Sequence, residues 1–172
     1  MTTFDEFKDL IFQWVSKVSG AEENRIIFDH SRGTTPEQPY IWIKVLTYDG
    51  PTGFMDENFT RNDETDESGE RVYSYHLGSR EHTVSIQAIG EGAFSRLSLL
   101  SRSLTKQTFQ VDIFAGKIAV SSIQPVVNLT EFFETTTEER ASLDITFAEK
   151  FCEREELTEF IEGVEIEDNL IG

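Results

Sequence analysis

Two stretches of the chain carry apolar residues at the spacing of an amphipathic helix. Residues 3–17 begin with Thr3 and Glu6, which fit a capping box, and Gly20 suits the C-terminal end of such a helix. Residues 93–106 predict a second helix. We expect both apolar stripes to pack into the core; they comprise Phe4, Phe7, Leu10, Ile11, Trp14, Val15 and Val18 in the first helix and Ala93, Phe94, Leu97, Leu100 and Leu104 in the second.

Residues 138–152 predict the clearest strand, because apolar and polar side chains alternate along them. The apolar residues of this alternation are Ala141, Leu143, Ile145 and Phe147, which we expect on one buried face. Further strands are predicted at residues 25–28, 40–48, 71–77, 82–89 and 117–128, with Pro125 interrupting the last of these, and a short pairing is predicted at 164–166.

Three segments between these elements are less regular. Gly78 and Ser79 are expected to form a turn between two predicted strands. Residues 108–114 fit either a short helix or a strand, and we favour the helix. Residues 31–39 contain one glycine and two prolines and predict a loop.

The elements follow the order helix, strands, helix, strands. This order predicts an α+β fold, in which two helices pack on one face of a mainly antiparallel sheet. With 172 residues, the chain is expected to form a single domain over residues 1–172. Trp42 lies between Ile41 and Ile43 on a predicted strand. We expect either helices on one face of that strand and a partner on the other, or a strand buried on both faces.

Residues 49–70 are polar and strongly acidic. We expect a long loop or an extended hairpin arm there, and loops of this length are usually functional or disordered. Three interpretations stay open: a solvated segment, a contact element that orders on meeting a partner, or a divalent cation site without EF-hand spacing. The candidate partner-contact or channel-facing residues are Asp56, Glu57, Asp63, Glu64, Asp66 and Glu67.

The acidic residues are concentrated in two segments. The formal net charge is −17, of which residues 55–70 carry −6 and residues 131–168 carry −11. This balance disfavours direct binding of nucleic acid through its phosphates, which depends on lysine and arginine. An acidic surface can instead repel DNA, mimic DNA or keep the protein in solution.

No combination of residues predicts catalysis, a cofactor or a metal site. Residues 90–95 begin like a dinucleotide-binding loop, but Ser95 stands at the third glycine position, so a strand-to-helix turn is the better interpretation. His76 and His82 lack metal-ligand spacing and are expected at the surface, flanking a hairpin. Cys152, the single cysteine, is expected to be a reduced thiol on a strand. We therefore predict a protein that is not an enzyme.

The sequence also bears on the compartment. No apolar run approaches the roughly 20 residues of a membrane-spanning helix, so we expect no membrane partner. The first six residues lack the basic start and apolar core of a secretion signal, which predicts a reducing compartment.

Five segments spread over most of the chain together resemble the pattern of a known protein family. They are the helix ending at Gly20, the proline-containing loop before residues 40–43, the strand at residues 85–90 that enters a helix, residues 138–145 and residues 161–166. Together they resemble the bacteriophage neck or tail terminator proteins.

The resemblance implies a structural α+β subunit that assembles into a ring of six. Such a ring caps the finished tail tube, ends its polymerisation and offers the attachment surface for the head connector. The implied partners are further copies of the chain, the tail tube with its sheath protein, and the head–tail connector, while DNA passes through without specific binding. The implied location is the tail–neck region of the virion, after synthesis in the host cytoplasm. Acidic residues facing the channel would repel phosphates.

Two other functions remain open at this point. The chain could be another connector or tail-completion protein of the same particle. It could also be an acidic DNA mimic that inhibits a basic host DNA-binding protein, in which case it would not form rings.

Overall fold

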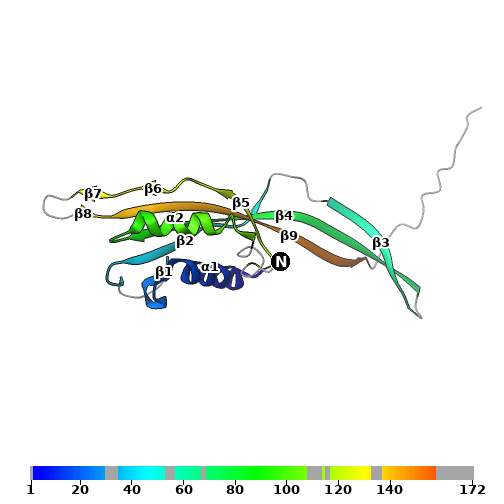
Figure 1. Ribbon diagram of the computed structural model, residues 1–172. Helices are drawn as coiled ribbons and strands as arrows, with labels where there is room; N and C mark the ends of the chain where they lie inside the picture. Colours follow the sequence, from blue (N-terminus) through cyan, green and yellow to red (C-terminus); the bar gives the residue numbers. More distant parts are fainter. Residues whose placement is uncertain are drawn as a thin grey trace, which may run out of the picture. The chain divides into compact units, whose positions relative to one another are not determined.

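A computed structural model describes residues 2–29, 35–52, 57–66, 69–107, 114, 117–132 and 137–157. The chain divides into two compact units: Met1–Phe54 with Ser79–Phe151, and Met55–Gly78 with Cys152–Gly172. The described elements are, in chain order, α1 (Phe4–Ser19), the short 3-10 helix η1 (Glu23–Arg25), β1 (Ile26–Phe28), β2 (Tyr40–Pro51), β3 (Glu57–Asp66), β4 (Gly69–Ile89), α2 (Ala93–Ser103), β5 (Ala119–Ile123), β6 (Val127–Asn128), β7 (Glu131–Phe132), β8 (Thr137–Glu138) and β9 (Arg140–Leu157) (Figure 1).

The ends of α1 confirm the predicted capping signals. The Thr3 N–H donates to Glu6 Oε2 at 2.9 Å, and the Glu6 N–H donates to Thr3 Oγ1 at 3.3 Å, which completes the capping box. Gly20 has a φ of 65° and closes the helix in the left-handed region that glycine tolerates. The core placement expected for Phe4 is wrong: its side chain is 44% exposed, because it lies in the first turn and meets the ring of Tyr48 edge-on at the border of the core.

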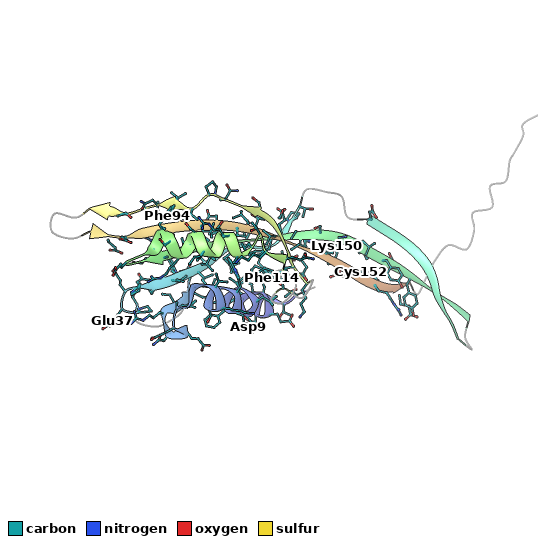
Figure 2. The ribbon with its side chains drawn as sticks, viewed as in Figure 1. Asp9, Glu37, Phe94, Phe114, Lys150 and Cys152 are labelled. Carbon is teal, nitrogen blue, oxygen red and sulfur yellow. The ribbon has the colours of Figure 1, made fainter. Side chains whose placement is uncertain are left out.

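The second helix is shorter than predicted and buries a narrower stripe. Ala93, Leu97 and Leu100 are buried, as expected. Phe94 is 48% exposed, so its assignment to the buried stripe is wrong (Figure 2). It lies about 100° around the helix from Ala93 and points off the buried face.

The described strands form a seven-stranded sheet. Five of them are neighbours in the order β1-β2-β4-β9-β5, while β3 pairs with β4 and β6 pairs with β9. The pairings whose register is defined are antiparallel, except that β1 runs parallel to β2. β5 and β6 both pair with β9 and flank Pro125, which confirms the predicted interruption. β7 and β8 form a separate two-stranded sheet.

The predicted turn at Gly78 and Ser79 is wrong. β4 runs through both residues without a break, because its backbone groups find partners on either side of that point. Leu77 pairs with Glu57 of β3, and Arg80 pairs with Pro51 of β2. Between residues 49 and 70, the hairpin alternative is confirmed, and the loop alternative is wrong for residues 57–66, which form β3.

One face of the sheet in the first unit carries the core. Its buried side chains alternate along β2, β4 and β9 and meet the buried faces of both helices, so α1 and α2 pack on the same face of the sheet. Trp14 is fully buried, and its indole Nε1 donates to Ser103 Oγ of α2 at 2.8 Å. The sheet residues of this core are Ile41, Ile43, Val84, Ile86, Ala88, Ala141, Leu143, Ile145 and Phe147.

Two sequence predictions fall largely outside the described residues. Of the segment 108–114, only Phe114 is described, and its side chain is buried. The short pairing predicted at 164–166 lies wholly outside the described residues.

Candidate functional site

The acidic hairpin, formed by β3 and residues 69–77 of β4, carries most of the candidate contact residues. Glu57 starts β3 opposite Leu77 and is exposed. Glu64 pairs with Arg71, and Asp66 pairs with Gly69 beside the end of the hairpin. Asp63 lies at a shift in register between its neighbours, where the ladder is locally interrupted. The remaining candidates, Asp56 and Glu67, lie outside the described residues.

The end of β9 adds a further acidic segment to the second unit. Glu155 Oε2 lies 3.8 Å from His76 Nε2 of β4. The Arg154 guanidinium sits 3.7 Å from the centre of the Tyr73 ring, which is buried. Glu153 is exposed on the same strand. The second unit therefore presents carboxylates from two different parts of the chain, whereas the contact residues predicted from the sequence come only from the first.

A buried polar cluster occupies the first unit, where sequence reasoning expected none. His82 is fully buried, so its predicted surface position is wrong. Its Nε2 lies 3.2 Å from Glu149 Oε2, and the Asp49 N–H donates to its Nδ1 at 3.0 Å. Because Nδ1 accepts a hydrogen bond, the proton of the neutral ring resides on Nε2, which donates to Glu149.

The other members of the cluster fasten the start of the chain to β9. Thr2 donates to Glu149 Oε1 through its N–H and through its Oγ1, the latter at 2.7 Å. The Tyr48 hydroxyl donates to the Thr2 carbonyl, and its ring stacks on His82 at 4.6 Å. Burial, and then the Glu149 carboxylate, raise the pKa of Tyr48 above its ordinary value of 10.0. The described polar side chains of the cluster have hydrogen-bond partners inside it, so the cluster joins Thr2, β2 and β4 to β9.

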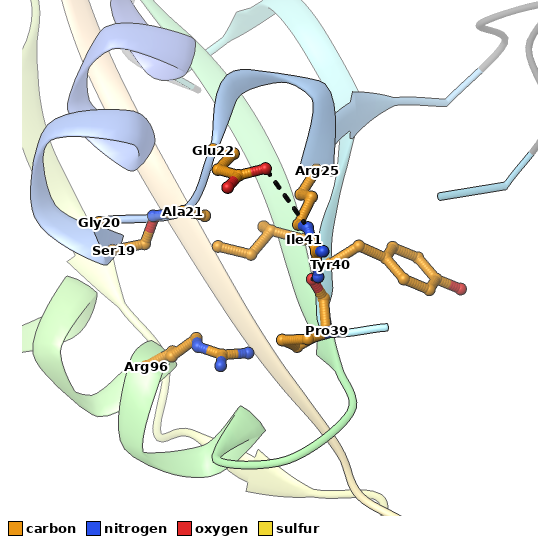
Figure 3. A pocket seen from close by; sticks show the side chains of 9 residues that line it. All are labelled: Ser19, Gly20, Ala21, Glu22, Arg25, Pro39, Tyr40, Ile41 and Arg96. Atoms are coloured by element: carbon orange, nitrogen blue, oxygen red, sulfur yellow. Dashed lines mark hydrogen bonds and ion pairs between the residues drawn. The ribbon is translucent and has the colours of Figure 1, made fainter. Parts of the chain in front are cut away.

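The first unit contains two hollows with charged residues in their walls. One, of about 280 Å³, lies between the end of α1 and the start of α2 (Figure 3). Arg25 lines it and pairs with Glu22 at 3.7 Å, and Arg96 enters it from α2. The other, of about 330 Å³, is bordered by Lys117, Lys150, Ser79, Glu149 of the polar cluster and three apolar residues, namely Ile118, Ala119 and Ala148.

The part of the chain that the structure describes also bears on metal binding and on membranes. No group of three histidine, cysteine or acidic side chains there could hold a metal ion. None of the described helices is long and apolar enough to cross a bilayer.

The comparison with protein families is decisive for identity. The family model described as phage neck terminator protein matches residues 3–171. The chain belongs to this family. No curated protein matches the chain.

Membership of the neck terminator family gives the coarse function. The protein is a structural component of a bacteriophage, located in the tail–neck region of the virion. As a neck terminator it interacts with other tail or head proteins of the phage.

Proposed function

We propose that the protein forms a ring, of six copies, that caps the phage tail tube. The ring ends tail polymerisation and presents the attachment surface for the head connector. The observation that carries this proposal is the family match over residues 3–171. The chain acts as a single domain over residues 1–172, without catalytic activity.

The face of the sheet that carries neither described helix supports assembly with neighbours. In the first unit both helices pack on one face, and Trp42 and Gln87, which pair across β2 and β4, lie on the other. Arg140 Nη2 donates to Gln87 Oε1 on that face at 2.6 Å. Asp144 Oδ1 is buried there without a hydrogen-bond partner among the described residues. A neighbouring copy that covers this face could supply the missing donor.

The acidic hairpin serves the same function through its charge. Its carboxylates contact a tail or connector protein, or face the channel and keep DNA from adhering. The residues proposed for this role are Asp56, Glu57, Asp63, Glu64, Asp66 and Glu67. DNA passes the ring without specific binding.

The test is a capping assay with tail tubes assembled in the absence of the terminator. The wild-type chain should bind one end of each tube and stop its growth. A variant in which Glu57, Asp63, Glu64 and Asp66 become amides should fold but cap or join heads less well. The control neutralises four exposed acids of the first unit, namely Asp9, Glu23, Glu37 and Glu91.

Tubes that keep growing with the wild-type chain would contradict the capping function. Equal activity of the hairpin variant and its control would contradict the role of the hairpin alone.

A further inference from the structure

Most cationic side chains that the structure describes have a partner. Lys44 pairs with Asp29 at 3.0 Å, for example, and Arg80 pairs with Asp49 at 3.4 Å. Within the described side chains, those without an ion pair, hydrogen bond or ring contact are Arg96, Arg102, Lys106 and Lys150. Three of these four lie on α2 or just after it, although the chain has 32 acidic residues.

The same helix exposes large apolar side chains. Leu99 is 54% exposed and Phe94 is 48% exposed. Leu99 follows Arg96 by three residues and precedes Arg102 by three, so the three side chains are neighbours on the helix surface. Residues 92–106 contain no acidic residue. We call Arg96, Leu99 and Arg102 the basic–apolar face of α2; Phe94 lies about 160° around the helix from Arg96 and is not part of it.

The hollow beside Arg96 extends this face. The Arg96 side chain reaches from α2 toward Pro39 on the opposite wall (Figure 3). The second arginine of the hollow, Arg25, is already engaged by Glu22 and by the carbonyl of Gln38 at 3.3 Å. Arg96 is therefore the cation available to an incoming carboxylate, with about 280 Å³ of space next to it.

A segment of complementary chemistry lies at the end of the same sequence. Residues 158–172 contain five acids and no base, and apolar residues alternate with these acids. Fifteen residues span at most about 50 Å when fully extended. The apolar members of the segment are Phe160, Ile161, Val164, Ile166, Leu170 and Ile171.

We propose that the basic–apolar face of α2 binds residues 158–172 of a second copy of the chain. Arginine clusters recognise acidic segments, and the exposed Leu99 between the two arginines offers contact area for the apolar residues between the acids. The two surfaces differ and belong to one chain, so each copy can bind one neighbour and be bound by another. Such a head-to-tail contact forms a ring when the rotation from copy to copy closes on itself. The inference rests on the proposed self-assembly and names the contact that mediates it.

The first test uses a fluorescent peptide with the sequence of residues 158–172, titrated with the full-length chain. It should bind the wild-type chain, and Arg96→Glu with Arg102→Glu should weaken binding by about tenfold or more. Lys150→Glu, which reverses an unpartnered cation elsewhere in the first unit, should leave binding unchanged. Thermal unfolding of each variant checks that it is folded. No binding to the wild-type chain, or equal binding to the α2 variant, would overturn the proposal.

The second test separates a neighbour's segment from the chain's own. One variant carries Arg96→Glu with Arg102→Glu, and the other carries Glu162→Lys with Glu165→Lys. Each alone should lose self-association at least about tenfold, and an equimolar mixture should recover it, because only unlike copies then match. A mixture that stays as dissociated as its components would show that the segment docks within its own chain, or elsewhere, and would contradict the proposal.

The same variants distinguish this contact from the proposed function. If the α2 variant fails to bind the peptide but still caps tail tubes, the contact is dispensable and the inference is wrong, while the capping function stands. If the peptide binds as expected but the wild-type chain caps no tube, the capping function fails and the contact stands.

Discussion

At the scale of single residues, hydrogen bonds at the start of α1 show what local sequence can specify. Thr3 and Glu6 are three residues apart, and each satisfies a backbone N–H of the other. These bonds lower the pKa of Glu6 below its ordinary value, first through the backbone N–H of Thr3 and then through its side chain. A local motif of this kind can be read from sequence because its partners are close along the chain.

Replacing Thr3 by alanine should therefore have two effects. The chain should lose about 1 kcal/mol of unfolding free energy, since a helix N-cap is removed. The pKa of Glu6 should rise toward its ordinary value, which carboxyl NMR titration measures. Since the folded pKa is lowered, the stabilisation is present above the ordinary pKa of 4.5 and is lost as pH falls through the folded pKa. Thr3→Ser is the control and should keep both properties.

The buried pair of His82 and Glu149 was missed, although a signal for it existed. His82 continues the alternation of Val84 and Ile86 on β4, and Glu149 continues that of Phe147 on β9. Period two alone would have placed both polar side chains on the buried face. That they meet could not be predicted, because they are 67 residues apart and the pairing of β4 with β9 brings them together.

Glu149→Gln tests this pair by changing few atoms. The new amide would place its N–H group against the Nε2–H of His82, so that two donors face each other. The ring cannot present Nδ1 as an acceptor instead, because Nδ1 already accepts from the Asp49 N–H. We expect a loss of about 1–3 kcal/mol in unfolding free energy, because a buried donor is left unsatisfied. Chemical denaturation measures the loss, and Glu153→Gln on the exposed part of β9 is the matched control. Equal stability of the two variants would show that the pair contributes nothing.

At the scale of elements, the sequence predicts the helices and most strands, but it is a weaker guide to the turns between them. The alternation on β9 predicted its buried face, because burial there follows directly from period two. Gly78 and Ser79 have the composition of a turn but lie inside β4, since pairing with β2 and β3 overrides local preference. The buried stripe predicted for α2 includes Phe94, whose side chain is exposed. The sequence does not reveal which residues at the border of a stripe a neighbouring element covers.

The turn from β4 into α2 carries a prediction at this scale. Gly90 has a φ of 94°, and a Cβ there would lie 3.0 Å from Pro39 Cα. Gly92 has a φ of 76° but open space around such a Cβ. Gly92→Ala should cost about 1 kcal/mol from backbone strain, and Gly90→Ala at least about 1 kcal/mol more from the clash. Thermal unfolding compares the two, and equal losses would mean that Pro39 moves away freely.

At the scale of the whole molecule, the fold class and the family were predictable from sequence, but the assembly surfaces were not. The α+β fold follows from the order of elements, and the family match covers residues 3–171. The acidity of residues 55–70 was evident, whereas the unpartnered cations of α2 emerge only once the partners of the other cations are known. Several of the ion pairs depend on contacts between residues that are distant in sequence, so the sequence alone does not show which cations stay unpaired.

Deleting residues 55–69 tests the independence of the acidic hairpin. These residues lie in the second unit, whereas the core of the first unit contains none of them. The shortened chain should therefore keep its helical circular dichroism and cooperative unfolding but should fail to yield infectious particles in a complementation assay. Normal infectivity would rule out a role for the hairpin in assembly, and loss of cooperative unfolding would show that the hairpin is needed for folding.

The central claim is that copies of this chain close into a ring on the end of the tail tube. The most direct measurement is the number of copies bound at each tube end, from electron microscopy class averages of tubes incubated with the purified chain. We predict a closed ring of six copies at one end of each tube and no further growth beyond it. Single copies, open filaments or tubes that lengthen past the bound protein would contradict the account.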